Sequence, residues 1–510
     1  MTIPQITGHS FYLIGPVVIF TVLAFIALLW GSVAPRAAAR GSLWLGMVGA
    51  LASLALVGLQ WPELSGSGTL LFGEMVSADR FSLFFTALIS GIVVLVLLLS
   101  RDYLEDEKIH VGEFYTLLFF CVAGILLLSM SNDLMLLFIA VELMSLAAYV
   151  LTGFNRGRFT CIEGALKYFI LGSFASAFLL FGISLVYGAV GTTNISAIGE
   201  LLGGSGGLAG AMTTLKANPR LTPEVLPVGV GMLIIGLAFK IGAAPFHMWV
   251  PDVYQGAPAP VTAFMSTAIK AGAFAAFVRL LTVAVPGLEE LWGPIIAGLA
   301  AVTMIVGNIA ALVQRDIKRM LAYSSVAHGG YAMMGFLAIN AGGDSTAVGA
   351  ILTYLIAYAT MNLGAFGVVI WLQNKADLEV TDLDSYGGLG FKFPWMAAAM
   401  TLFMISLGGL PPTAGFIAKF NLFSAVVGAG YTPLVILALM TSMASMYYYL
   451  RVVVYMYMRP EMGTVSLRSS ALPGVVVGLT ALAVLLLGLF PSSGPIQILQ
   501  WARDSVQALL

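Results

Sequence analysis

Four ionisable residues lie deep inside long apolar stretches of this 510-residue chain: Glu142, Lys240, Lys270 and Lys419. Each is too far from the end of its apolar run for its charged tip to reach water along the helix. A charge at the centre of a bilayer costs about 2.5–3.5 kcal/mol on insertion scales, so we expect these groups to face the protein interior, water or one another. We interpret all four as proton-carrying residues.

A buried lysine suits this task because burial changes how firmly it holds its proton. The ordinary lysine pKa is about 10.4, and burial lowers such a value by up to roughly 3–5 units. A carboxylate about 4 Å away restores about 4 kcal/mol at an effective dielectric near 20. Movement of Glu142 toward or away from a lysine would therefore load or unload that lysine. The sequence alone does not identify which lysine faces Glu142.

Three further candidates have ordinary structural explanations beside the functional one. Lys167 lies one helical turn after Glu163, and an ion pair between them explains it as well as proton transfer does. His328 could relay protons between two half-sites, or it could be a hydrogen-bonded packing histidine. His247 is kept as a channel residue.

The composition indicates the environment of these residues. The chain is 60% hydrophobic and 9% charged, with a mean hydropathy of +0.98, which is typical of a polytopic membrane protein. A net charge of −1 argues against nucleic acid as a partner. Cys121 and Cys161 form no CxxC or Cys/His pattern, so we predict no metal site and no cofactor site in this chain.

Apolar runs near the spanning length of about twenty residues recur along the whole chain, and they predict an all-α protein with about fourteen transmembrane helices. We place these spans at residues 11–31, 43–61, 81–100, 111–130, 133–153, 164–190, 227–248, 256–285, 291–313, 320–340, 346–372, 394–427, 431–457 and 471–490. The stretch 202–210 is expected to be a flexible loop. Arg279 and Arg451 lie nearer the ends of their spans and are expected to snorkel to the interface.

Cations in the connections predict the orientation. Thirteen lysines and arginines follow odd-numbered spans, whereas only four follow even-numbered spans or lie in the tail: Arg80, Lys216, Arg220 and Arg503. Cytoplasmic connections carry the excess of basic residues, so both termini are expected outside the cytoplasm. The N-terminus has no basic region ahead of its first apolar run, which we therefore interpret as a retained span in a bacterial plasma membrane.

Two of the lysine-bearing spans are predicted to be broken. The seventh carries Pro245 five residues after Lys240, and the twelfth carries Gly408, Gly409 and a double proline ahead of Lys419. A proline inside a helix removes a backbone hydrogen bond, and opened backbone at membrane depth is tolerated only where it is buried or lines a cavity. Because the two spans cross in opposite senses, they indicate an inverted-repeat transporter.

These segments also resemble a known family. Residues 240–274, KIGAAPFHMWVPDVYQGAPAPVTAFMSTAIKAGAF, residues 314–331, QRDIKRMLAYSSVAHGGY, and residues 408–420, GGLPPTAGFIAKF, are similar to the antiporter-like membrane subunits of respiratory complex I. That superfamily also contains Mrp cation/proton antiporters and membrane-bound hydrogenase subunits. The resemblance covers residues 80–500. One branch of the complex I subunits is favoured by residues 163–195, which contain the KYF segment at positions 167–169.

The resemblance implies two inverted five-helix repeats in spans four to eight and nine to thirteen. It divides the chain into an N-terminal three-span segment, a first half, a second half, and a last span with a short tail, at residues 1–110, 111–285, 286–457 and 458–510. It also implies the roles of the site residues. Glu142 modulates Lys240, which takes a proton from the cytoplasm; Lys270 and His328 pass it on, and Lys419 releases it outward.

In the implied assembly, quinone reduction elsewhere drives the transport. FMN, iron–sulfur clusters, NADH and quinone are expected on other subunits, and the expected partners are antiporter-like subunit M, small membrane subunits such as K, and the lipid bilayer. Lysine rather than glutamate at position 419 and the absence of a long lateral helix separate the chain from its M and L paralogues. An Mrp-type sodium/proton antiporter subunit, a hydrogenase membrane subunit and a passive scaffold remain as alternatives.

Overall fold

The computed structural model describes residues 7–64, 68–107, 111–203, 207–339, 346–374, 379–461, 465–491, 497–507 and 509. Long helices dominate the first half of the described chain, because in lipid every backbone amide must be satisfied within its own segment. These helices are α1 (Gly8–Leu13), α2 (Gly15–Val33), α3 (Pro35–Glu63), α4 (Arg80–Asp106), α5 (Val111–Ser129), α6 (Leu134–Thr152), α7 (Phe159–Val190), α8 (Ile195–Gly203), α9 (Gly207–Lys216), η1 (Pro223–Val225), α10 (Leu226–Ile241) and α11 (Trp249–Gly256).

The second half continues in the same way. Its helices are α12 (Ala259–Phe264), η2 (Met265–Ile269), α13 (Lys270–Arg279), η3 (Leu280–Ala284), α14 (Glu289–Leu312), α15 (Ile317–Met334), η4 (Gly335–Ala338), α16 (Thr346–Trp371), η5 (Leu383–Tyr386), α17 (Leu389–Lys392), α18 (Pro394–Gly408), α19 (Ala414–Gly428), α20 (Thr432–Met458), α21 (Leu472–Leu489) and α22 (Ile498–Val506). Two antiparallel strand pairs lie in the connections: β1 (Thr69–Leu71) with β2 (Val76–Ala78), and β3 (Leu372–Asn374) with β4 (Val465–Leu467).

The polytopic all-α architecture is confirmed. Within the described residues, 12 helices are long and apolar enough to cross a membrane. The two other expected spans coincide with α15, which is rich in polar residues, and with the pair α18 and α19, each of which is shorter. The count of fourteen therefore stays a prediction, as do the domain boundaries, of which residue 110 lies outside the described residues.

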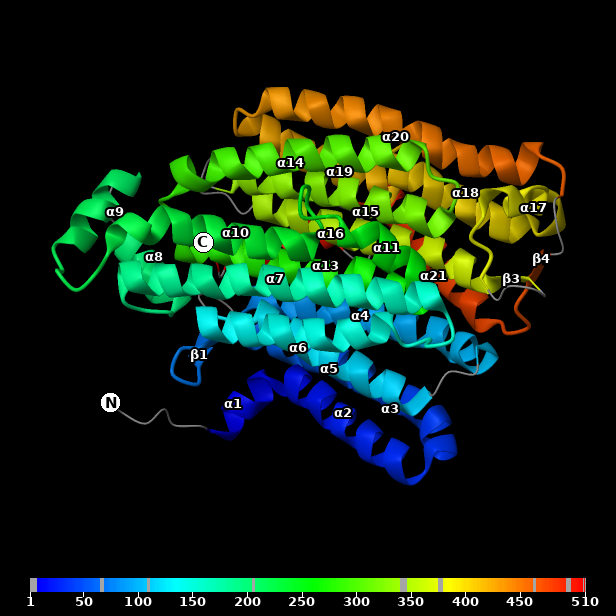
Figure 1. Ribbon diagram of the computed structural model, residues 1–510, viewed down its shortest axis with the longest axis horizontal. Coiled ribbons are helices and arrows are strands. Elements are labelled where there is room, and N and C mark those ends of the chain that lie inside the picture. The colour runs from blue at the N-terminus through cyan, green and yellow to red at the C-terminus, as the bar shows by residue number, and fades with distance from the viewer. Residues whose placement is uncertain are drawn as a thin grey trace.

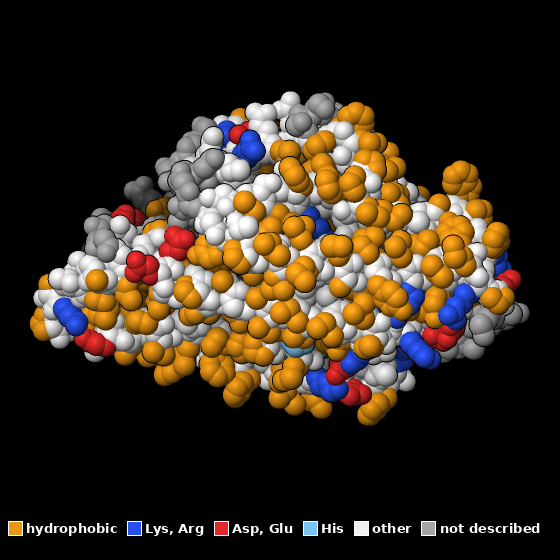
Figure 2. Space-filling model, turned by 90° about the horizontal axis from the view of Figure 1, so that it is seen from above, with side chains coloured by type: hydrophobic (Ala, Val, Ile, Leu, Met, Phe, Trp, Pro, Cys, Tyr) orange, Lys and Arg blue, Asp and Glu red, His pale blue; other side chains and the backbone are white. Residues whose placement is uncertain are grey.

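The long axis of the molecule runs along the helices (Figure 1). Helices α1, α8 and α9 lie at one end, and α17 with the β3–β4 pair lies at the other. Hydrophobic side chains cover most of the face seen in Figure 2, while Lys, Arg, Asp and Glu gather mainly toward its ends. This distribution is typical of a protein whose flanks face lipid. The expected loop at residues 202–210 is shorter than predicted, because residues 202–203 belong to α8 and residues 207–210 to α9; residues 204–206 lie outside the described residues.

Both expected helix breaks are present. Helix α10 ends at Ile241, one residue after Lys240, and is capped by Gly242, whose φ of 79° requires the left-handed conformation that glycine adopts without strain. Helix α18 ends at Gly408 and is capped by Gly409, whose φ is 88°, and α19 begins five residues after this cap. The Ala244–Pro245 and Pro411–Pro412 peptide bonds in the two breaks are cis. Each break lies next to one of the predicted lysines.

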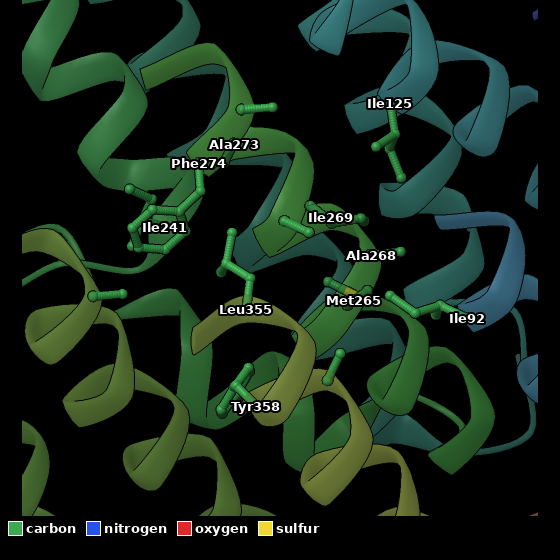
Figure 3. Packing of buried hydrophobic residues seen from close by; sticks show 14 of the residues in the cluster. Ile92, Ile125, Ile241, Met265, Ala268, Ile269, Ala273, Phe274, Leu355 and Tyr358 are labelled. Atoms are coloured by element: carbon green, nitrogen blue, oxygen red, sulfur yellow. The ribbon is translucent and has the colours of Figure 1, made fainter. Parts of the chain in front are cut away.

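A continuous span from α12 to η3 occupies the centre of the molecule, and its apolar window is entirely buried. Figure 3 shows its side chains Ile269 and Phe274 among residues of other helices, including Ile125 of α5 and Leu355 of α16. Two π-helical segments, η2 and η3, flank α13. Lys270 is the first residue after η2, so the most buried span of the protein carries an ammonium group at an irregular point of its backbone.

Candidate functional site

The first buried lysine lies against the helix that carries the expected glutamate. Lys240 is 2% exposed and donates hydrogen bonds to Ser145 Oγ (2.8 Å) and to the hydroxyl of Tyr149 (3.3 Å). Both acceptors follow Glu142 on the same face of α6 at helical spacing. Glu142 is half-buried and accepts a short hydrogen bond from Ser176 of α7. Lys240 is thus the lysine on the Glu142 face, and among the described ion pairs neither residue takes part.

The second lysine joins α13 to α15. Lys270 is 4% exposed, and its Nζ donates to the carbonyl oxygen of Ser325 (2.5 Å) and to Ser325 Oγ (2.6 Å) on α15. The ring of Tyr358 lies 5.5 Å away. A Cβ on Gly329 would lie 3.6 Å from Lys270 Nζ and 3.2 Å from a side-chain carbon of Ile241, the residue next to Lys240. The bare backbone of Gly329 therefore separates the Lys240 region from Lys270.

The third lysine binds the open end of a broken helix. Lys419 of α19 is 6% exposed and donates to the carbonyl oxygens of Leu407 (3.1 Å) and Gly408 (3.0 Å) and to Ser442 Oγ (2.8 Å). The last carbonyl groups of a helix have no hydrogen-bond donor within that helix. Because α18 ends at the break, its last carbonyl groups can accept hydrogen bonds from the Lys419 amine. A cavity of about 440 Å³ between α19 and α20 borders Lys419.

A histidine and two tyrosines occupy the interval between Lys270 and Lys419. His328 is buried; its Nδ1 shares a hydrogen bond with the Tyr354 hydroxyl (2.6 Å), and its Nε2 shares one with the Tyr449 hydroxyl (3.2 Å). Tyr449 also hydrogen-bonds Ser324 Oγ (2.5 Å), beside the serine that binds Lys270. The sequence alone does not identify Tyr449. Its position seven residues after Ser442 places both residues on the same face of α20, and this spacing is the one signal that could have indicated it.

The remaining step toward Lys419 is aromatic. The His328 and Tyr331 rings meet edge to face with centroids 5.8 Å apart, and Lys419 Nζ lies 5.2 Å from the Tyr331 ring. The ionisable groups from Glu142 to Lys419 therefore lie in succession on α6, α10, α13, α15 and α19, with the Gly329 backbone between Lys240 and Lys270 and the Tyr331 ring between His328 and Lys419. We call this succession the lysine line. All direct hydrogen-bond acceptors of the three lysines are uncharged, and an ammonium group without an ion pair is expensive in a dry interior.

Two of the candidates, Lys167 and His247, lie away from this line. Lys167 is half-exposed and forms the expected ion pair with Glu163 (2.7 Å). It also forms a second ion pair, with Asp252 (2.6 Å), which the sequence did not predict. His247 lies in the break between α10 and α11, and its Nδ1 is buried without a hydrogen-bond partner. A cavity of about 580 Å³ near Lys167 is lined by Arg158, Glu163, Asp252 and Glu379, among others.

The arginines depart from the expectation of snorkelling. Arg279 is 3% exposed and forms a two-point ion pair with Asp79, the N-cap of α4, at 2.9 and 3.1 Å. Arg451 donates to the carbonyl oxygens of Leu312 (2.8 Å) and Gln314 (2.5 Å) at the end of α14. The prediction was wrong for Arg279 because its partner lies 200 positions away in the chain, where no local pattern reveals it.

Broken helices with buried lysines in an all-α membrane fold define a transporter-like class, and comparison identifies the family. The family described as NADH:quinone oxidoreductase/Mrp antiporter, TM, matches residues 131–446, more than half of the chain. The chain belongs to this family.

Particular relatives narrow the comparison. NADH-quinone oxidoreductase subunit N of Trichlorobacter lovleyi is 42% identical over 499 residues, which cover 97% of this chain and 96% of that protein. The branch favoured by the sequence was subunit N, and this prediction is confirmed. A chain of respiratory complex I from Thermus thermophilus is 33% identical, with a TM-score of 0.76 over 93% of this chain and 97% of its own.

The fold extends beyond complex I. A chain of the Mrp complex from Dietzia sp. matches with a TM-score of 0.80 at 20% identity, over 98% of this chain and 99% of that chain. At this identity the match shows a shared fold, so the fold alone does not separate a complex I subunit from an antiporter subunit. The sequence identity distinguishes the two, because it is 42% to the subunit N relative and 20% to the Mrp chain.

Proposed function

We propose that this chain is the subunit N-type membrane subunit of a proton-translocating NADH:quinone oxidoreductase. The supporting observation is that Lys240, Lys270 and Lys419 are each buried against neutral hydrogen-bond acceptors. Such lysines can exchange protons without breaking a strong ion pair. The redox reaction belongs to other subunits of the assembly, and it drives proton movement in this one.

Proton transfer proceeds in the order of the contacts. Glu142 acts on Lys240 through the shared face of α6, and Lys240 exchanges with Lys270. Lys270 bonds Ser325, and its proton passes by way of the neighbouring Ser324 and Tyr449 to His328. Lys419 releases the proton on the far side. Lys167 serves mainly in the ion pairs with Glu163 and Asp252, and His247 lines the opening beside α10.

Uptake starts at the 580 Å³ cavity, which lies on the side predicted to be cytoplasmic. One face of α7 leads inward from it: Gly164 lines the cavity, and Tyr168 follows one turn later. The Tyr168 ring stacks on Trp249 (4.4 Å) and meets the ring of Tyr149 (4.6 Å), whose hydroxyl accepts from Lys240. These aromatic rings separate the cavity from Lys240.

The partners follow from the same assignment. The chain is a membrane-arm subunit that contacts an antiporter-like subunit M and small subunits such as K in a bacterial inner membrane, with both termini on the periplasmic side. NADH, FMN, iron–sulfur clusters and quinone act on the other subunits of the complex.

The assignment is tested in the purified complex reconstituted into vesicles. NADH:quinone reductase activity and proton movement are measured for the wild type and for Lys240→Ala, with Lys167→Ala as a control in a half-exposed ion pair. Lys240→Ala is expected to assemble, to retain quinone reduction and to move fewer protons per NADH. Normal proton movement in Lys240→Ala would contradict the proposal, and a requirement for sodium would favour the antiporter alternative.

A further inference from the structure

One buried carboxylate outside the lysine line collects an unusual number of donors. Glu379 Oε1 accepts from the Tyr103 hydroxyl (2.6 Å) and from the backbone N–H of Ala259 (2.9 Å). Its Oε2 accepts from Lys318 Nζ (2.9 Å) and pairs with Arg158 (3.4 Å). The Lys318 side chain is 0% exposed and that of Glu379 is 7% exposed. Although Glu379 borders the 580 Å³ cavity, a pair with so little exposed surface depends on complete hydrogen bonding.

The donors come from the starts of two helices that meet at Lys270. Ala259 is the first residue of the central span, which carries Lys270, and Lys318 lies about two turns before Ser325 on α15. Lys318 also donates to the carbonyl oxygen of Ala257 (2.7 Å), just ahead of that span. The Glu379–Lys318 pair therefore fastens the beginning of the Lys270 helix to the beginning of the Ser325 helix.

The segment that carries Glu379 is itself fixed to α15. The backbone N–H of Ile317 donates to the carbonyl oxygen of Thr381 (2.7 Å), and that of Leu383 donates to Arg315 (2.9 Å). These bonds make residues 379–383 an extension of the start of α15. The side chain of Glu379 then reaches across to the backbone N–H of Ala259. Beside the bond of Lys318 to Ala257, this carboxylate is the second link between the two helix starts.

From these contacts we infer that Glu379 is a positioning residue for proton transfer, which sets the contact of Lys270 with Ser325 by holding the starts of their helices together. The inference rests on the proposed function. Glu379 does not touch the lysine line itself. The chain offers a matched control on the same connection, because Asp384 pairs with Arg459 (3.5 Å) with side chains that are 40% and 49% exposed, and ion pairs open to solvent contribute little.

The test is a double-mutant cycle in the reconstituted complex. Glu379→Gln, Ser325→Ala, the double variant and the control Asp384→Asn are compared for protons moved per NADH oxidised, a ratio that does not change with the amount of assembled complex. We expect about a three- to tenfold loss in each single variant, no change in Asp384→Asn, and no further loss in the double variant, since coupled residues are non-additive.

Two results would overturn the inference: proton movement in Glu379→Gln equal to that in Asp384→Asn, or losses that multiply in the double variant. If Glu379→Gln does not assemble, Tyr103→Phe removes one hydrogen bond from the same carboxylate and keeps its ion pair. A Lys270→Ala variant distinguishes failure of the proposed function from failure of the positioning role of Glu379. Normal proton movement in Lys270→Ala would reject the proposed function, whereas its loss together with a normal Glu379→Gln would reject only the positioning role.

Discussion

At the scale of single residues, the neutral surroundings of the three lysines set the chemistry. Hydroxyl and carbonyl oxygens satisfy Lys240, Lys270 and Lys419 without compensating their charge. An amine in such surroundings can be hydrogen-bonded whether or not it carries the extra proton. Hydroxyl groups can both donate and accept, so Ser324 and Tyr449 are suited to link Lys270 with His328.

The sequence identified the lysines but not these hydroxyl groups. A charge within an apolar run is visible in one segment, because its cost does not depend on what packs beside it. The role of Tyr449 becomes visible only in the fold, where α20 lies next to α15. In the same way, Asp79 is recognisable from the sequence only as a helix N-cap, and its pairing with Arg279 is visible only in the fold. Contacts between distant segments carry no local signal.

Replacement of Tyr449 by phenylalanine tests the bridge. Tyr449→Phe removes one hydroxyl that bonds both Ser324 and His328, and a hydrogen bond is worth about 0.5–1.5 kcal/mol net, so we expect proton movement about three- to tenfold slower. The rate is followed in vesicles with a pH-sensitive dye. Tyr447→Phe, at a side chain that is 63% exposed on the same helix, is expected to match the wild type. Equal rates in both variants would remove Tyr449 from the path.

At the scale of helices, the two breaks deliver backbone groups to the lysine sites. Proline and glycine patterns predicted both breaks, because these residues disrupt helices whatever their neighbours are. The glycines of residues 202–210 predict a loop in the same way, yet residues 202–203 and 207–210 are helical, and residues 204–206 lie outside the described residues. Tertiary packing of amphipathic faces overrides a weak local preference of this kind.

Substitution at the second break tests its role. Gly409→Ala places a side chain at a φ of 88°, which costs roughly 1–2 kcal/mol, and its Cβ would lie 2.9 Å from Lys419 Cδ. We expect a lower midpoint of heat inactivation and reduced proton movement. Gly428→Ala, at the end of α19 with open space around it, is expected to change neither. A Gly409→Ala variant that resembles Gly428→Ala would show that Lys419 does not depend on the shape of the break.

At the scale of the whole molecule, buried ionic contacts join parts that are distant in the chain. The central span is fastened near one end by Glu379 and near the other by the Arg279–Asp79 pair. Between these ends lie Lys270 and its irregular backbone, so movement on proton transfer is expected near η2 rather than at the ends. Orientation is also a property of this scale, and only the distribution of cations predicts it.

The pH dependence of stability tests the Glu379 contact. Burial by itself raises the pKa of the Glu379 carboxyl, but Lys318, Tyr103 and Arg158 outweigh burial and hold the pKa below its usual value. A lowered carboxyl pKa stabilises the fold above the ordinary value of about 4.3, and this stabilisation disappears as the pH falls through the folded-state value. Removal of a partner from a buried pair costs on the order of 3–5 kcal/mol.

We therefore expect Glu379→Gln to unfold at a lower temperature than the wild type near pH 7, with a difference that shrinks below about pH 4. Heat unfolding of the detergent-solubilised complex across a pH series measures this difference. Asp384→Asn supplies the baseline for an exposed carboxylate. A difference that stays constant or grows toward acid pH would show that the charge of Glu379 does not stabilise the fold.

The central claim is that the buried lysines exchange protons rather than merely supply positive charge. Lys419→Arg separates the two, since arginine keeps its charge and does not deprotonate in proteins, and the 440 Å³ cavity beside Lys419 offers room for the larger side chain. The decisive measurement is the number of protons moved per NADH oxidised by the reconstituted Lys419→Arg complex. We predict a value equal to that of Lys419→Ala; a value equal to that of the wild type would contradict the account.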